Sequence, residues 1–299
     1  MKSWLKGIIP PLVTPFDEHG KIDEAALAAE VEFQISCGAK ALCVGGSTGE
    51  GAGLKAEEVF DLCSMCVKHV RDRVPVIGGV ISDTTDEAIE LGLAAKKARV
   101  KALQITPPHY VFRPGPTELV SFYSRIKEAT GLPIILYNVI PWAQVSSDAI
   151  GLLLDAGAID AVKQSGSNMH LIADLLYRFG KKAPILSAVD DLLYPSFVLG
   201  APGAVAAIVT VLPKESVALY EAVQRGDQAE ALKMHHKLLL VWRALEGETG
   251  FPGRVKYAIA LQGRSAGLPR HPQRAANEED RAVVRKALQE AGIPANPAN

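Results

Sequence analysis

The chain has 299 residues, of which 48% are hydrophobic and 22% are charged, a composition typical of a globular protein with a large core. Its formal net charge of −1 gives no electrostatic footprint for nucleic acid or an anionic membrane, so the expected partner is a small molecule. No apolar run reaches the roughly 18 residues of a membrane span, and the segment before Gly7 lacks the pattern of a signal peptide. We therefore expect a cytoplasmic protein with reduced cysteines.

Short apolar runs alternate with longer amphipathic runs from the N-terminus, and each strand-like run precedes a helical one. The predicted strands are residues 7–13, 39–44, 74–80, 101–105, 133–137, 158–163, 184–187 and 203–208. The clearest helix start signals are Asp23, Thr85 and Ser147, ahead of helices expected at residues 24–35, 86–98 and 148–155. Eight such units predict an α/β fold of the (β/α)8, or TIM, barrel type. A doubly wound open sheet is the alternative, because periodicity does not determine whether the sheet closes.

Two of the four cysteines, Cys63 and Cys66, form a Cys-x-x-Cys pair of the kind found in metal and redox sites. They fall within an apolar pattern of helical period, and no second Cys or His pair at zinc spacing follows them. We therefore predict that both are buried in the core and that the protein uses no metal.

Beyond the eighth predicted strand the pattern is entirely helical, at residues 214–225, 228–245, 254–262 and 278–291. A barrel requires only one helix after its last strand. We therefore predict a catalytic barrel over residues 1–225 and a small helical extension over residues 226–299, with a break near residues 247–253. The tail from Gly292 is rich in Pro, Asn and Ala, and we expect it to be frayed.

Reactive side chains lie at the C-terminal ends of predicted strands, where (β/α)8 proteins build their active sites. The sixth strand ends in Lys163, whereas Lys101 begins the fourth strand and belongs to the opposite, structural face. A lysine facing a partly desolvated cavity favours its neutral amine, which can attack a carbonyl. Lys163 is therefore the candidate Schiff-base nucleophile, with a salt-bridged or solvated lysine as the alternative.

Two further strand ends carry polar groups. Tyr137 closes the fifth strand, where its phenol can relay protons to an imine, unless its ring only packs. The second strand runs into the glycine-rich turn of residues 45–50, whose backbone N–H groups and two hydroxyls suit a carboxylate or a phosphate. This turn lacks the signatures of a nucleotide P-loop and of a dinucleotide site, so no organic cofactor is expected.

These segments, in this order, resemble the dihydrodipicolinate synthase and N-acetylneuraminate lyase family of class I, pyruvate-dependent aldolases. The matching segments are residues 11–16 (PLVTPF), 46–50 (GSTGE), 106–108 (TPP), 137–139 (YNV) and 162–164 (VKQ). They extend over nearly the whole chain, and the lysine follows the tyrosine by 26 residues. The resemblance implies a (β/α)8 lyase whose lysine forms an imine with pyruvate or a related 2-oxo acid.

The resemblance also implies a role for each matching residue. Lys163 would form the Schiff base, and Tyr137 would be the acid/base phenol above it. Ser47 and Thr48 would bind the carboxylate of the oxo acid, with Ser47 also passing protons. The backbone carbonyl of Val205 would face the bound oxo acid.

The proton relay of the synthases includes another tyrosine, which reaches across a subunit contact. The corresponding loop of residues 107–114 is one or two residues longer here. Tyr110 is predicted for this role, with His109 as its competitor. Since family members are commonly dimers of dimers, we expect a homo-oligomer, either a dimer or a homotetramer.

The second half of the pocket departs from the family pattern. Trp142 stands where the synthases carry an arginine that holds a dicarboxylic partner, and residues 188–190 (AVD) replace the usual Gly-Asp-Asp. We therefore predict that Trp142 walls the site, that His109 and Arg113 also face the second substrate, and that Arg113 is the alternative carboxylate clamp.

The leading prediction is a lyase that makes or cleaves a C–C bond between an enamine derived from a 2-oxo acid and an aldehyde. The alternatives are 4-hydroxy-tetrahydrodipicolinate (dihydrodipicolinate) synthase proper, a dehydratase of 2-oxo-3-deoxy sugar acids, and a non-enzymatic 2-oxo acid sensor.

Overall fold

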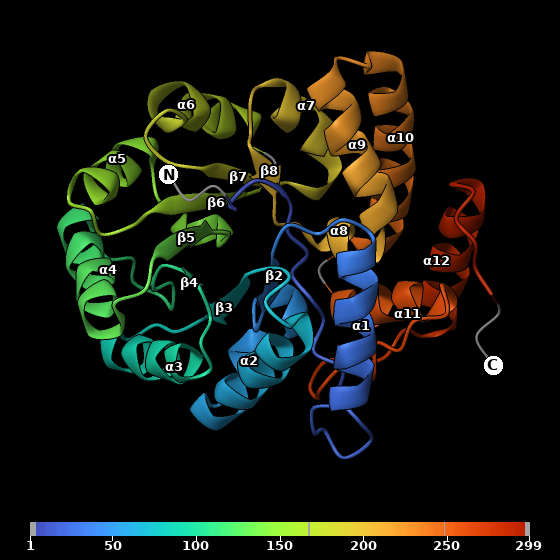
Figure 1. The fold of residues 1–299 in the computed structure, drawn as a ribbon, viewed down its shortest axis with the longest axis horizontal. Helices are drawn as coiled ribbons and strands as arrows, with labels where there is room; N and C mark the ends of the chain where they lie inside the picture. Colours follow the sequence, from blue (N-terminus) through green and yellow to red (C-terminus); the bar gives the residue numbers. More distant parts are fainter. Residues whose placement is uncertain (1–3, 167, 248, 297–299) are drawn as a thin grey trace.

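The computed structural model describes residues 4–166, 168–247 and 249–296 (Figure 1). Within them, eight parallel strands form one sheet in the order β1-β8-β7-β6-β5-β4-β3-β2. The strands are β1 (Gly7–Ile8), β2 (Leu42–Val44), β3 (Val76–Val80), β4 (Ala102–Ile105), β5 (Ile134–Asn138), β6 (Ala161–Ser165), β7 (Ile185–Ala188) and β8 (Gly203–Ala204). All eight predicted strands are present, and helices surround the curled sheet (Figure 1). This is a TIM-like (β/α)8 arrangement.

The two end strands of this order, β1 and β2, are linked by the backbone that follows β1. Pro11 forms an isolated parallel bridge with Cys43. The Leu12 N–H donates to the Cys43 carbonyl at 2.8 Å, and the Cys43 N–H donates to the Pro10 carbonyl at 3.0 Å. Hydrogen bonds therefore continue across the edge at which an open sheet would end.

Nine helices follow the strands in the first 225 residues of the described chain. They are α1 (Glu24–Ser36), α2 (Ala56–Val70), α3 (Thr85–Lys97), α4 (Pro116–Thr130), α5 (Ser147–Asp155), α6 (Met169–Phe179), α7 (Leu193–Val198), α8 (Ala207–Val211) and α9 (Pro213–Arg225). The predicted cap Asp23 is confirmed, because its carboxylate accepts from the Ala26 N–H. The other two caps were placed one residue too late. Thr84 and Ser146 are the capping residues, since their hydroxyls accept from the third residue of the following turn.

The eighth strand is shorter than predicted. Residues 203–208 were expected to be extended, but β8 ends at Ala204 and α8 begins at Ala207. Every residue of α8 is buried, and an unbroken apolar run has the same pattern whether it forms a buried strand or a buried helix. The sequence alone could not separate the two.

The C-terminal part is helical, as predicted, and consists of α10 (Gln228–Leu245), α11 (Phe251–Leu261) and α12 (Glu278–Glu290). Its apolar side chains share one core cluster with β1 and α9, because Leu238 and Val284 belong to the same buried group as Ile8 and Leu219. The division at residue 225 stays a prediction. This shared core packs the C-terminal helices directly against β1 and α9.

The tail is better held than the composition suggested. Ile293 is buried, and the Asn296 N–H donates to the Leu261 carbonyl at 2.8 Å. The prediction of a frayed tail from Gly292 is therefore wrong for residues 292–296, where an apolar anchor and a backbone bond offset the unfavourable composition. Residues 297–299 lie outside the described part.

Cys63 and Cys66 lie on the inner face of α2 and are buried in the main core cluster, which confirms their prediction as core residues. Burial raises the pKa of the Cys63 thiol to about 12.

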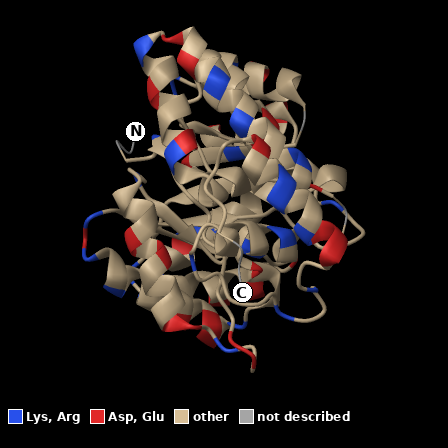
Figure 2. Cartoon of the chain, turned by 90° about the vertical axis from the view of Figure 1, so that its right-hand side faces the viewer, with Lys and Arg blue, Asp and Glu red and all other residues tan. Residues whose placement is uncertain are grey.

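Lys and Arg are interspersed with Asp and Glu over the outer helices (Figure 2). None of the helices in the described ranges is long and apolar enough to cross a membrane.

Candidate active site

A cavity of about 270 Å³ opens at the C-terminal ends of the strands. Four residues predicted from the sequence for the catalytic half of the site line it together, and so does Val205. Its described lining consists of Ser47, Thr48, Tyr137, Val139, Lys163, Ser165, Gly166, Ala188, Asp190, Val205, Ala206, Ala207, Trp242 and Phe251. These residues come from widely separated parts of the chain, which the fold brings to one face.

Lys163 lines the cavity beside Tyr137. It is directly opposite Tyr137 in the register of β5 and β6, so alternation along both strands turns the two side chains inward. Lys163 is only 3% exposed, and its Nζ lies 3.6 Å from the centroid of the Tyr137 ring. No carboxylate of the described residues pairs with Nζ within 4.0 Å. The amine is therefore free to meet a ligand and lies against a phenol.

Asn138 and Gln164, which follow these two residues, turn to the other face of the sheet and fix the strand ends. The Asn138 Nδ2 donates to Gln164 Oε1 at 2.8 Å and to the Val145 carbonyl at 3.0 Å. The Val145 N–H returns a bond of 2.8 Å to Asn138 Oδ1. The Tyr-Asn and Lys-Gln pairs of the sequence thus combine an inward reactive group with an outward amide that holds it in register.

The turn after β2 consists of two short 3-10 turns, η1 (Ser47–Gly49) and η2 (Gly51–Gly53). Glu50 joins them in the left-handed conformation, with φ of 56°. A Cβ on Gly51 would lie 1.8 Å from the Gly45 carbonyl oxygen, so only glycine fits there. The Thr14 hydroxyl donates to the Gly49 carbonyl at 2.6 Å. The turn therefore presents Ser47 and Thr48 to the cavity from a rigid backbone.

Asp190 also lines the cavity; it belongs to the segment 188–190 noted as a departure from the family pattern, but no role was predicted for it. Burial raises the pKa of its carboxyl to about 7, while the Ile208 N–H and the charge of Lys163 act in the opposite direction. Its Oδ1 accepts from the Ile208 N–H at 2.7 Å, which ties the β7 end to the start of α8. The acidic pair after the seventh strand was the signal that could have identified it.

A test of Asp190 follows from the raised pKa. The unfolded chain ionises this carboxyl at a lower pH, so the stability it contributes is complete at acidic pH and is lost as pH rises through about 7. Asp190→Asn keeps an acceptor for the Ile208 N–H but cannot ionise. We expect the melting temperature of the wild type to fall more than that of the variant between about pH 5 and about pH 8.

The neighbouring residue provides the control for this experiment. Asp191 pairs with Arg243 at 3.3 Å, and Asp191→Asn removes a carboxylate from the same turn. A melting-temperature difference between wild type and Asp190→Asn that stays constant over this pH range would show that Asp190 does not titrate there. Equal pH effects of both substitutions would assign the dependence to the turn as a whole.

Two aromatic residues of the C-terminal helices also line the cavity and were not predicted. Trp242 lies on α10 and Phe251 begins α11. Their rings pack edge to face, with 5.9 Å between the ring centroids. In the sequence each is one more apolar residue of an amphipathic helix, and no local pattern indicates that it reaches another part of the fold. The C-terminal extension therefore contributes a wall of the cavity.

The residues predicted for the second-substrate half do not line the Lys163 cavity in the single chain, although His109 lines a neighbouring cavity of about 460 Å³ that also includes Ser47. Trp142 is 63% exposed, and its Nε1 donates to the His109 carbonyl at 3.0 Å. Tyr110 is 77% exposed, and its N–H, like that of His109, donates to Asp83 Oδ1. None of these three aromatic side chains is among the residues that line the Lys163 cavity. Their assigned roles stay predictions.

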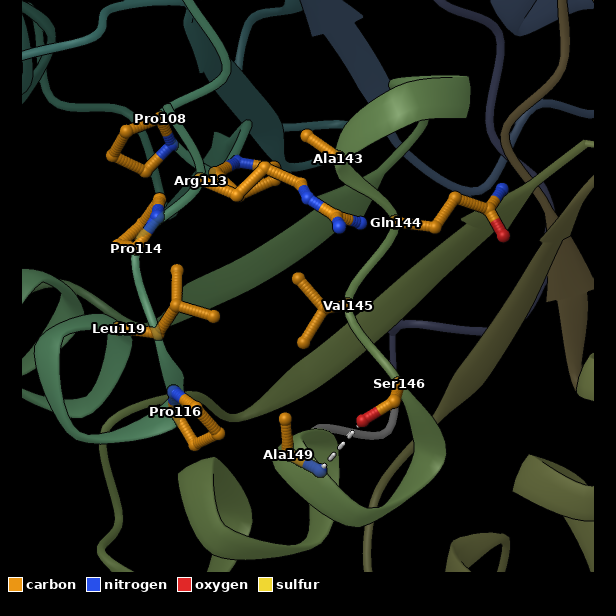
Figure 3. A pocket seen from close by; sticks show the side chains of 11 residues that line it. Pro108, Arg113, Pro114, Pro116, Leu119, Ala143, Gln144, Val145, Ser146 and Ala149 are labelled. Carbon is orange, nitrogen blue, oxygen red and sulfur yellow. Dashed lines mark hydrogen bonds between the residues drawn. The ribbon is translucent and has the colours of Figure 1, made fainter. Parts of the chain in front are cut away.

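Arg113 faces a separate pocket of about 320 Å³ between the loops that follow β4 and β5. Figure 3 shows its guanidinium extending toward Gln144 and Val145, with Pro108 and Pro114 beside it. Arg113 does not line the Lys163 cavity. A clamp by Arg113 on a substrate held at Lys163 therefore stays a prediction.

Comparison with known proteins gives one family. The model of the dihydrodipicolinate synthetase family matches residues 4–291. The chain belongs to this family. A curated relative, 4-hydroxy-tetrahydrodipicolinate synthase of Bartonella bacilliformis, is 33% identical over 293 residues, which cover 97% of this chain and 99% of the relative. The predicted resemblance is thereby confirmed, as is the prediction of an enzyme of the lyase class.

Solved structures agree with this family membership. The dihydrodipicolinate synthase of Aquifex aeolicus superposes with a TM-score of 0.90 at 30% identity, covering 97% of this chain and 99% of that one. YagE, a prophage protein of the dihydrodipicolinic acid synthase family from E. coli K12, was solved in complex with pyruvate. It superposes with a TM-score of 0.91 at 27% identity, covering 96% of this chain and 99% of that one. These two family members therefore share the fold over nearly the whole chain.

Proposed function

We propose that this protein is a Schiff-base aldolase that joins pyruvate or a related 2-oxo acid to an aldehyde, or cleaves the corresponding product. The observation that carries the proposal is the buried Lys163 amine, placed against the Tyr137 ring in a cavity that also receives the Ser47–Thr48 turn. Family membership and the pyruvate complex of YagE support the choice of oxo acid.

In this mechanism the neutral Lys163 amine attacks C2 of the oxo acid, and loss of water gives an imine. Tyr137 supplies and accepts the protons of these steps, while the hydroxyls and N–H groups around Ser47 and Thr48 hold the carboxylate. The protonated imine withdraws electrons from C3, which loses a proton and becomes an enamine. The enamine then attacks the aldehyde carbon, and hydrolysis of the new imine frees Lys163.

We propose, with this mechanism, that the sheet is a closed barrel and that the protein acts as a homo-oligomer. The hydrogen bonds between residues 8–12 and 40–43 support closure. The exposed aromatic loop that carries Tyr110 supports assembly, because a second chain covering it would bury Tyr110 and Phe112. In such an assembly Tyr110 would join the proton relay of the neighbouring subunit.

The described lining of the cavity favours an uncharged aldehyde. Lys163 is the only Lys or Arg among those residues, and the imine consumes it. Trp242 and Phe251 add apolar surface instead. A carboxylate on the second substrate would forgo a charge-assisted pair, typically worth about 1.5 to 3 kcal/mol. Dihydrodipicolinate synthase proper, which uses a carboxylated aldehyde, is therefore the less favoured form of this function.

Steady-state kinetics with pyruvate decide between these forms. We expect kcat/KM to be higher for an uncharged aldehyde than for aspartate semialdehyde, when the two aldehydes are of similar size. The control is Arg113→Ala, which we expect to leave both values unchanged, because Arg113 faces another pocket. A marked preference for aspartate semialdehyde that disappears in Arg113→Ala would instead establish a synthase with Arg113 as its clamp. Product formation without pyruvate would contradict the enamine mechanism.

A further inference from the structure

A buried ion pair joins the turn that carries Ser47 and Thr48 to the C-terminal helices. The Lys256 Nζ lies 2.7 Å from Glu50 Oε1, and the two side chains are 3% and 8% exposed. Lys256 belongs to α11, whereas Glu50 joins η1 to η2. Burial lowers the pKa of Lys256, and the Glu50 carboxylate opposes this shift. The pair therefore connects α11 to the turn between η1 and η2.

The remaining bonds of Lys256 reach the same turn by a second route. Its Nζ donates to the carbonyls of Thr14 at 2.8 Å and Leu268 at 2.6 Å. The Thr14 hydroxyl in turn donates to the Gly49 carbonyl at 2.6 Å. Two ammonium donors thus bond carbonyl oxygens, and the third contact of the ammonium is the ion pair with Glu50. The other oxygen of Glu50 accepts from the Arg270 N–H at 2.8 Å.

The backbone of Glu50 gives an independent reason for this arrangement. With φ of 56° it occupies the left-handed region, which is unfavourable for a residue with a side chain. Glycine would adopt it without strain, and glycines stand on both sides. Such strain persists where the surrounding contacts hold it, and here the contacts are those of the carboxylate. We infer that the contacts of the Glu50 carboxylate offset the backbone strain, which a glycine at this position would avoid.

We propose that Glu50 and Lys256 are positioning residues that hold Ser47 and Thr48 in place for the carboxylate of the oxo acid. The proposal rests on the proposed function and extends it to the C-terminal helix α11. Neither residue lines the Lys163 cavity. Their effect is transmitted through the turn, so it should appear in oxo acid binding more than in the reaction of bound substrate.

The test measures pyruvate binding by reductive trapping. Protein is incubated with increasing pyruvate and borohydride, and the adduct fraction is read from the intact mass. We expect Glu50→Gln to raise the half-saturating pyruvate concentration about tenfold, the effect of weakening one hydrogen bond to a charged group, with little change in the limiting adduct fraction.

A second buried pair provides the matched control. The Arg264 Nη2 lies 2.5 Å from Glu30 Oε1, with side chains 6% and 2% exposed. Glu30 lies on α1 and lines none of the Lys163 cavity. Glu30→Gln removes the same charge from a similar environment, so we expect a comparable loss of thermal stability and an unchanged half-saturating pyruvate concentration.

A double variant separates positioning from folding. Glu50→Gln alone leaves the Lys256 ammonium buried and unpaired, whereas Glu50→Gln with Lys256→Met removes both charges. We expect the double variant to recover melting temperature but not pyruvate affinity. Recovery of both melting temperature and pyruvate affinity in the double variant would overturn the proposal. It would also be overturned if Glu50→Gln left the half-saturating pyruvate concentration unchanged, or if Glu30→Gln raised it equally. A wild type that forms no adduct would contradict the proposed function itself, which is a different outcome.

Discussion

Lys163→Ala and Lys163→Arg are both expected to abolish turnover while leaving the fold intact. The reaction requires a neutral primary amine at the carbonyl carbon, which a methyl group lacks and a guanidinium cannot supply. Lys163 has no ion-pair partner within 4.0 Å among the described residues, so its removal breaks no ion pair there. Activity assays of the purified variants, with circular dichroism as the folding check, measure this effect.

Lys101→Ala is the control for this experiment. Lys101 is an exposed lysine directly before β4, at the opposite end of the strands, so its loss should not affect the rate. Normal turnover in either Lys163 variant would exclude Lys163 as the nucleophile. A loss of activity in Lys101→Ala of similar size would indicate that the assay reports general damage.

Tyr137→Phe is expected to slow the reaction by roughly 10²- to 10⁴-fold, the usual contribution of a general acid or base. The ring that packs against Lys163 remains, and only the proton-carrying hydroxyl is lost. Imine formation should continue at a reduced rate, so that single-turnover kinetics would show slow steps rather than absent binding.

Tyr123→Phe is the matched control for the loss of a buried phenol. Tyr123 is fully buried in the core of the fold, and its hydroxyl makes a long bond of 3.4 Å to the Ile105 carbonyl. We expect this variant to change stability slightly and the rate not at all. If Tyr137→Phe reacts as fast as Tyr123→Phe, the Tyr137 ring serves packing alone.

Much of the fold was predictable because hydrophobic periodicity reports which face of an element is buried. The eight strands and the helical extension follow directly from it. The errors have local causes. The caps at Thr84 and Ser146 were missed by one residue because each is followed by an identical hydroxyl residue. Only the geometry of the turn decides which of the two hydroxyls accepts the hydrogen bond. The helix α8 was missed because a buried apolar run has no periodicity.

The candidate site divides in the same way. Lys163, Tyr137 and the Ser47–Thr48 turn stand at strand ends, and the (β/α)8 topology brings strand ends together. Trp242 and Phe251 reach the cavity through the packing of α10 and α11, which no local pattern encodes. Trp142 was assigned to the wall from the family pattern; it is exposed and does not line the Lys163 cavity of the single chain, so this role stays a prediction.

The central claim is that Lys163 itself forms the imine, and peptide mapping after borohydride reduction tests it most directly. Wild-type protein reduced in the presence of pyruvate should carry the pyruvate-derived mass on the peptide that contains Lys163, and the adduct should be absent without pyruvate and in Lys163→Arg. An adduct on another lysine, or none at saturating pyruvate in the active enzyme, would contradict the account.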